Sequence, residues 1–213
     1  MITWMHIIDI GHTAVMVPVA GTVAAWLVLG RAWKLAAWWC LIFASGLVIV
    51  ASSKIAYLGW GLEIPAIGFK ALSGHAWRAT AVLPVFFFVL LQHAPAHWRM
   101  RGALFGVMLS IGLAGLLVVF GFHTVSEVLA SFVLGIAASL AFLRAAADSA
   151  PPSMRPWAVP VCLMSFLVIW SLKPSSINHR LVDVALYFSG RDEPYRWTHG
   201  HDLPLPRKQR REC

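Results

Sequence analysis

A histidine and a glutamate with helical spacing open one of the long apolar runs of this chain. His123 lies in FGFHTVSEVLASF (120–132), and Glu127 follows four residues later. Because residues four apart share a helix face, Glu127 can hold one imidazole nitrogen of His123 and leave the other basic. An imidazole oriented in this way serves as a nucleophile or a general base. His123 and Glu127 are therefore candidate catalytic residues.

A second polar segment, FKALSGHAWRAT (69–80), precedes another apolar run. Ser73 offers a hydroxyl, Gly74 lets a ligand approach the backbone, and His75 would lie in the first turn of a helix. Exposed N–H groups at a helix N-terminus favour an anion. Lys54, at the end of an earlier apolar run, would add a positive charge. The four residues predict an anion-binding site.

The composition places these segments in a membrane. Of 213 residues, 59% are hydrophobic and 12% are charged, and the mean hydropathy is +0.73. A soluble domain carries about twice that charged fraction. The expected fold is all-α, a polytopic membrane helical bundle of about six transmembrane helices. The expected spans are residues 12–30, 36–57, 77–93, 102–121, 124–143 and 157–172.

The basic residues predict the orientation of the bundle. Arg31, Lys34, Arg99, Arg101 and Arg144 lie in the short loops or span ends on one side, which the positive-inside rule makes cytoplasmic. Both histidine segments then emerge on the opposite, periplasmic face of a bacterial inner membrane. Residues 1–172 form the expected transmembrane domain, and 173–213 form a polar basic tail whose KPSSINHRLVDVALYF segment suits an interfacial helix. The net charge of +8 indicates contact with the lipid bilayer, not with nucleic acid.

Taken in order, Lys54, Ser73-Gly74-His75 and His123 with Glu127 resemble the three-part signature of the type 2 phosphatidic acid phosphatase superfamily. The resemblance covers about residues 5–145. It implies a phosphatase-like helical core in which His123 attacks phosphorus to form a phosphohistidine and Glu127 orients it. His75 would protonate the leaving alkoxide. Lys54, Ser73 and Gly74 would hold the phosphate oxygens, and no metal or cofactor is required.

The chain departs from that signature at two arginines. Gly61-Leu62 stands where the family has Arg-Pro, and Leu116-Leu117 stands where it has Ser-Arg. The acid is also Glu127, where aspartate is usual. An arginine contact to a phosphoryl group is worth several kcal/mol in the transition state. Basic residues that could replace the missing pair are Arg78, Lys70, Arg180, Arg191 and Arg196.

The resemblance predicts an integral-membrane phosphatase or phosphotransferase acting on a lipid-linked phosphate or pyrophosphate. Two alternatives stay open. The chain could be a degenerate member that binds a lipid phosphate or a partner protein, or His75 and His123 could ligate haem. A metal site at His199 and His201 in THGHD is a weak further hypothesis. The tryptophans are interpreted as interfacial anchors, with Trp60 and Trp77 contacting lipid at the mouth of the site.

Overall fold

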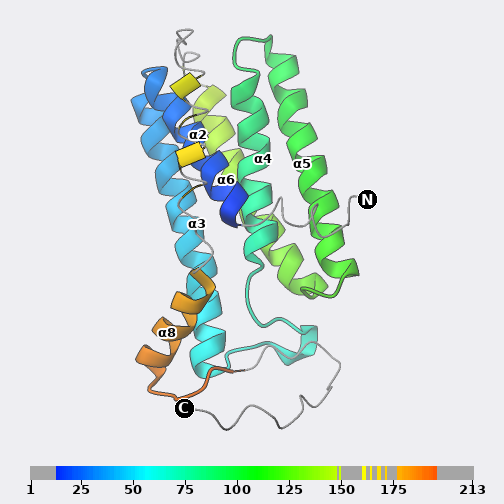
Figure 1. The fold of residues 1–213 in the computed structure, drawn as a ribbon. Coiled ribbons are helices and arrows are strands. Elements are labelled where there is room, and N and C mark those ends of the chain that lie inside the picture. Colours follow the sequence, from blue (N-terminus) through cyan, green and yellow to red (C-terminus); the bar gives the residue numbers. More distant parts are fainter. Residues whose placement is uncertain are drawn as a thin grey trace.

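The computed structural model describes residues 13–147, 149, 160–161, 164, 167–168, 171 and 177–195. Within these residues the protein is all-helical, apart from an isolated bridge between Ile64 and Phe69. Five helices form the bundle drawn in Figure 1. They are α2 (Thr13–Leu29), α3 (Trp33–Trp60), α4 (Gly74–Leu90), α5 (Ala96–Val119) and α6 (Val125–Ala147). A short 3₁₀ turn, η2 (Pro65–Ile67), follows α3, and α8 (Ile177–Ser189) follows the bundle.

Three of these helices, α3, α5 and α6, are long and apolar enough to cross a membrane. The other two bundle helices, α2 and α4, are apolar but have 17 residues each. The first five expected spans therefore coincide with helices, and the chain is a helical membrane protein. The sixth expected span, 157–172, lies mostly outside the described residues, so the count of six stays a prediction.

Helix α4 is the centre of the bundle. It contacts α2, α3, α5 and α6, and most of its residues are buried. Small residues on the neighbouring helices allow this close approach. A Cβ added at Gly106 of α5 would lie 2.6 Å from the Leu83 carbonyl, and one at Gly135 of α6 would lie 2.7 Å from the Thr80 Cβ. The small-residue positions of the sequence are thus helix contacts, as membrane bundles require.

Trp77 corrects one expectation. It was expected to contact lipid, but its side chain is fully buried, stacks on Phe43 at 5.3 Å between ring centroids, and fills the space left by Gly46 of α3. Trp60, with 49% of its surface exposed, remains available to the interface. An indole at the first turn of α4 faces inward because that helix is surrounded by others.

Helix α3 extends beyond the bundle. Its 28 residues make it about 42 Å long at 1.5 Å per residue, compared with about 30 Å of hydrocarbon core. It ends at Gly61, which has a φ of +66° and whose N–H donates to Ala56 and Tyr57 carbonyls. The expected tail helix is confirmed as α8, which packs beside this end of α3 (Figure 1). A Cβ at Gly59 would lie 3.1 Å from the Ala185 carbonyl oxygen, so glycine permits that contact.

Candidate functional site

The N-terminus of α4 carries Ser73-Gly74-His75. Ser73 is the N-cap residue, and its Oγ accepts a hydrogen bond from the Ala76 N–H at 3.4 Å. This serine side chain is fully buried. Gly74 is the first helical residue, and His75, half-buried, follows it. The helix begins three residues earlier than the expected span, which brings His75 into its N-terminal turn, where the helix dipole favours an anion.

The first turn of α6 is closed by Thr124 and Glu127. The Thr124 N–H donates to Glu127 Oε2 at 3.3 Å, while the Glu127 N–H donates to Thr124 Oγ1 at 3.4 Å. This reciprocal pair is a capping box. Thr124 is therefore the N-cap of α6, and the same carboxylate that could orient a histidine also fixes the start of its helix.

His123 lies directly beside this carboxylate. Its Nδ1 is 2.7 Å from Glu127 Oε2. Glu127 has no exposed surface, whereas 12% of the His123 side chain is exposed. With Nδ1 held by the carboxylate, Nε2 is the ring nitrogen that can act on a ligand. The spacing of four residues thus produces the predicted contact between imidazole and carboxylate.

The two helix N-termini are joined by hydrogen bonds. The Ser73 N–H donates to Ser131 Oγ at 2.7 Å, and that hydroxyl donates to the Glu127 carbonyl at 2.6 Å. The Lys70 N–H donates to Glu127 Oε1 at 3.2 Å. The segment that carries the first histidine is therefore fixed to the helix that carries the second.

Two more hydroxyls hold the segment 68–73 in place. Thr124 Oγ1 donates to the Gly68 carbonyl at 3.0 Å, and the Leu72 N–H donates to Ser53 Oγ of α3 at 3.1 Å. Neither Ser53 nor Ser131 was among the predicted site residues. Their positions facing the N-termini of α4 and α6 could be foreseen only with the helix arrangement in hand.

Arg78 folds back over Gly74. The guanidinium is largely buried, and a Cβ added at Gly74 would lie 2.9 Å from Arg78 Nη1. Lys54 is close enough to interact electrostatically with both Arg78 and Glu127. Two cations and one carboxylate leave a net positive charge among these three groups. That balance suits an anionic ligand beside His75 and His123.

The positions of the two missing arginines are apolar in the structure. Gly61 ends α3 and has no side chain, and a Cβ added there would lie 2.7 Å from the Tyr195 ring. Leu117 is buried against Ala76, Ala114 and Val128, so it occupies packed space next to the site. As the sequence indicates, neither position supplies a positive charge.

Most of the basic residues suggested as replacements for the missing arginines are not brought to the site by the structure. Arg191 packs over the Tyr195 ring at 4.2 Å and donates to its hydroxyl at 3.1 Å. Arg180 is exposed on α8. Arg196 lies outside the described residues. Arg78 is the candidate whose guanidinium is brought against the predicted phosphate-binding residues.

No cluster of three or more metal-ligating side chains occurs within the described part of the chain. His199 and His201 lie outside it. His123 and Glu127 offer one imidazole and one carboxylate in contact, a set that suits acid–base or nucleophilic chemistry.

Comparison with known proteins gives one informative relative. A protein described as an uncharacterized 22.5 kDa protein in the cps region of Klebsiella pneumoniae is 28% identical over 203 residues, which cover 93% of this chain and 97% of the relative. No family model and no solved structure matches the chain.

Proposed function

We propose that this protein is an integral-membrane phosphatase that acts on a lipid-linked phosphate or pyrophosphate through a phosphohistidine. The contact that carries the proposal is the 2.7 Å hydrogen bond between His123 Nδ1 and the buried Glu127 carboxylate. It supports a single reactive nitrogen, Nε2, pointing away from the carboxylate.

The reaction needs two steps. His123 Nε2 attacks phosphorus while the bond to the leaving oxygen breaks, and His75 gives that oxygen a proton. Water then attacks the phosphohistidine, His75 takes its proton, and the phosphorus–nitrogen bond breaks to release phosphate. Arg78, Lys54, Ser73 and Gly74 would hold the phosphoryl oxygens, so that charge developing there meets preorganised donors.

The arrangement of helices supports a lipid substrate. The site lies at the ends of apolar helices that cross the membrane, so a substrate could keep its hydrocarbon chain in the bilayer while its phosphate reaches His123. We place the site on the periplasmic face of a bacterial inner membrane, because the short loops at the other end carry the basic residues. The relative from Klebsiella pneumoniae is compatible with a bacterial envelope setting.

The test is phosphate release by the purified protein from a panel containing phosphatidate, a long-chain alkyl phosphate and a polyprenyl pyrophosphate. His123→Ala should reduce release to background and abolish an acid-labile phosphoryl label on the protein. His97→Ala is the matched control, because His97 is exposed in the first turn of α5 (Ala96–Val119). Equal release by the wild type and His123→Ala would refute a phosphohistidine. Transfer of the label to an added alcohol would identify a phosphotransferase.

One observation favours a second function. Leu117 fills space where the family signature carries an arginine, and it packs against Ala76 of α4. A site without that contact could bind a lipid phosphate without cleaving it. Retained binding of an alkyl phosphate with no release from any member of the panel would establish this second function.

A further inference from the structure

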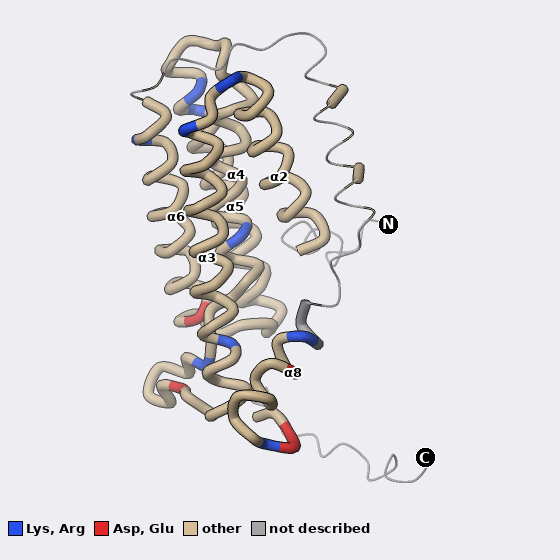
Figure 2. The backbone as a smooth tube through the Cα atoms, turned by 90° about the vertical axis from the view of Figure 1, so that its left-hand side faces the viewer, with Lys and Arg blue, Asp and Glu red and all other residues tan. Residues whose placement is uncertain are grey.

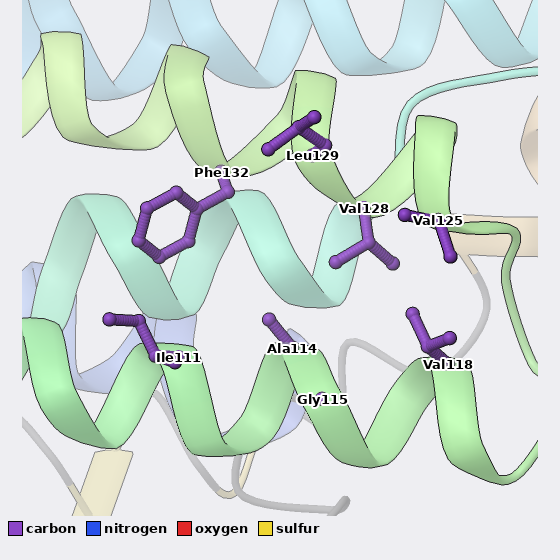
Figure 3. Close-up of a pocket in the computed structure, with 8 residues that line it drawn as sticks. All are labelled: Ile111, Ala114, Gly115, Val118, Val125, Val128, Leu129 and Phe132. Atoms are coloured by element: carbon purple, nitrogen blue, oxygen red, sulfur yellow. The ribbon is translucent and has the colours of Figure 1, made fainter.

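A groove between α5 and α6 is lined only by apolar residues. Its walls are residues 111–118 of α5 and 125–132 of α6, and its volume is about 320 Å³. Figure 3 shows these side chains facing one another across the groove, with α4 behind it. This volume falls within the range of ligand sites, which is about 300–1,000 Å³. Both walls belong to helices that are long and apolar enough to cross a membrane.

The groove begins near His123 and the N-terminus of α4. Val125 and Val128 line it, and they lie two and five residues after His123 on the same helix. Val128 also packs with Ala76, which follows His75 on α4. Val118 also lines the groove, and the His123 N–H donates to the carbonyl of the preceding Leu117 at 3.3 Å, so an apolar ligand in the groove would end at the turn that carries His123.

We propose that this groove binds the proximal part of one hydrocarbon chain of a phosphorylated lipid whose phosphate occupies the site. The inference rests on the proposed function in taking the site to hold a phosphate that carries such a chain. A methylene group occupies about the volume of a water molecule, roughly 30 Å³. The groove thus accommodates on the order of ten methylene groups, which is part of a single chain.

The occupant is a chain and not a helix of a partner, because the groove ends at the turn that carries His123, the nucleophile of the proposed phosphate site. A phosphate joined to a hydrocarbon chain suits both: the anion would meet Lys54 and Arg78 of that site, and the chain would meet the apolar walls of the groove. A ligand without a chain would leave the groove to bulk lipid.

Two glycines of α5 allow a matched test. A Cβ added at Gly115 or at Gly112 would meet no atom within 4 Å, so neither position opposes a larger side chain. Gly115 lines the groove, whereas Gly112 is not among its lining residues. Gly115→Leu should fill the groove, and Gly112→Leu should add the same side chain outside it.

The probe is a hexadecyl phosphate carrying a diazirine on its chain, cross-linked to the full-length protein in lipid vesicles and located by mass spectrometry. Labelling within residues 111–132 is expected, and unlabelled hexadecyl phosphate should compete for it. Gly115→Leu should reduce labelling on the order of tenfold, as expected when space for one or two methylenes is lost, and Gly112→Leu should not. Labelling unaffected by Gly115→Leu, or equal labelling by a hexadecanol probe, would overturn the proposal.

The readout separates this inference from the proposed function. The cross-link requires binding and no turnover, so His123→Ala should label like the wild type. Groove labelling without phosphate release from any substrate would refute the phosphatase and sustain the chain site. Phosphate release that is equal for long-chain and butyl phosphates and insensitive to Gly115→Leu would refute the chain site and sustain the phosphatase.

Discussion

Glu127 combines three structural roles in a single buried side chain. It caps α6 through Thr124, anchors the segment before α4 through the Lys70 N–H, and fixes Nδ1 of His123. A carboxylate this constrained gives the imidazole one orientation and one usable nitrogen. Its use as a cap explains why a glutamate suits the position: a third helical residue of this kind reaches back to the N-cap N–H.

Arg78 and Gly74 give the first prediction at this scale. In Gly74→Ala the new Cβ would lie 2.9 Å from Arg78 Nη1, so the guanidinium must move. If that guanidinium holds the phosphoryl group, kcat/KM should fall by about ten- to a hundredfold, less than the 10²–10³ of removing a donor outright. The melting temperature should not fall, because alanine favours the helix over glycine by about 1 kcal/mol.

Gly112→Ala is the control for that change: its Cβ would meet nothing within 4 Å, so activity should not change, and stability should not fall. Arg78→Ala should lower kcat/KM further than Gly74→Ala does. Full activity in both Gly74→Ala and Arg78→Ala would show that the guanidinium has no part in phosphate binding.

Sequence patterns predicted some of these contacts and could not predict others. The His123–Glu127 contact follows from a spacing of four residues at a helix start, which is local information. The direction of Arg78 does not, because its side chain turns back toward Gly74 only when α4 is enclosed by other helices. Trp77 was misplaced for the same reason: interface preference describes tryptophan on an exposed helix, and α4 has little exposed surface.

At the scale of elements, the Ser131 side chain links α4 to α6 by hydrogen bonds. Its hydroxyl accepts from the Ser73 N–H and donates to the Glu127 carbonyl. Ser131→Ala leaves the buried Ser73 N–H without its acceptor, at a cost of about 1–3 kcal/mol in unfolding free energy. Because α4 would then shift relative to α6, kcat/KM should fall as well. Denaturation in detergent and phosphate release measure the two effects.

Ser139→Ala is the matched control on the same helix. Ser139 is also buried, but its hydroxyl donates to the Ile136 carbonyl within α6. Its removal should change the unfolding free energy by less than about 0.6 kcal/mol, the average for hydrogen bonds between helices of a membrane protein, because this bond joins no second helix. Equal losses of unfolding free energy in the two variants would mean that the hydrogen bond between the helices stabilises the protein no more than the bond within α6.

The helix positions themselves were largely readable from the sequence, because apolar runs of membrane length are a strong signal. The start of α4 was the exception. The expected span began at residue 77, after the polar triplet, whereas Ser73 caps the helix and draws Gly74 and His75 into it. Hydropathy marks where a helix meets lipid, and a cap marks where its backbone begins. Ser73, Gly74 and His75 lie between these two points.

At the scale of the whole molecule, the two ends of the bundle differ in their charged residues and in how far their helices extend. Figure 2 shows Lys and Arg at both ends of the bundle, whereas the Asp and Glu residues of the described chain lie toward the α8 end. The α8 end carries the long projection of α3, the 61–73 segment and the candidate site (Figure 1). The sequence predicted which short loops hold basic residues at the end opposite α8, because that is read directly from the residues between the apolar runs. It could not predict that α8 packs against the projecting end of α3, a contact that needs Gly59.

The last prediction concerns orientation. With Cys40, Cys162 and Cys213 replaced by alanine, single cysteines at Glu63 and at Lys34 should report opposite sides of the membrane, since both positions are exposed. A membrane-impermeant maleimide should label Glu63→Cys in intact spheroplasts and label Lys34→Cys only after lysis. The cause is the cost of moving basic loops across the inner membrane. Reversed labelling would place His123 in the cytoplasm, and its substrate would then have to present its phosphate on the inner leaflet.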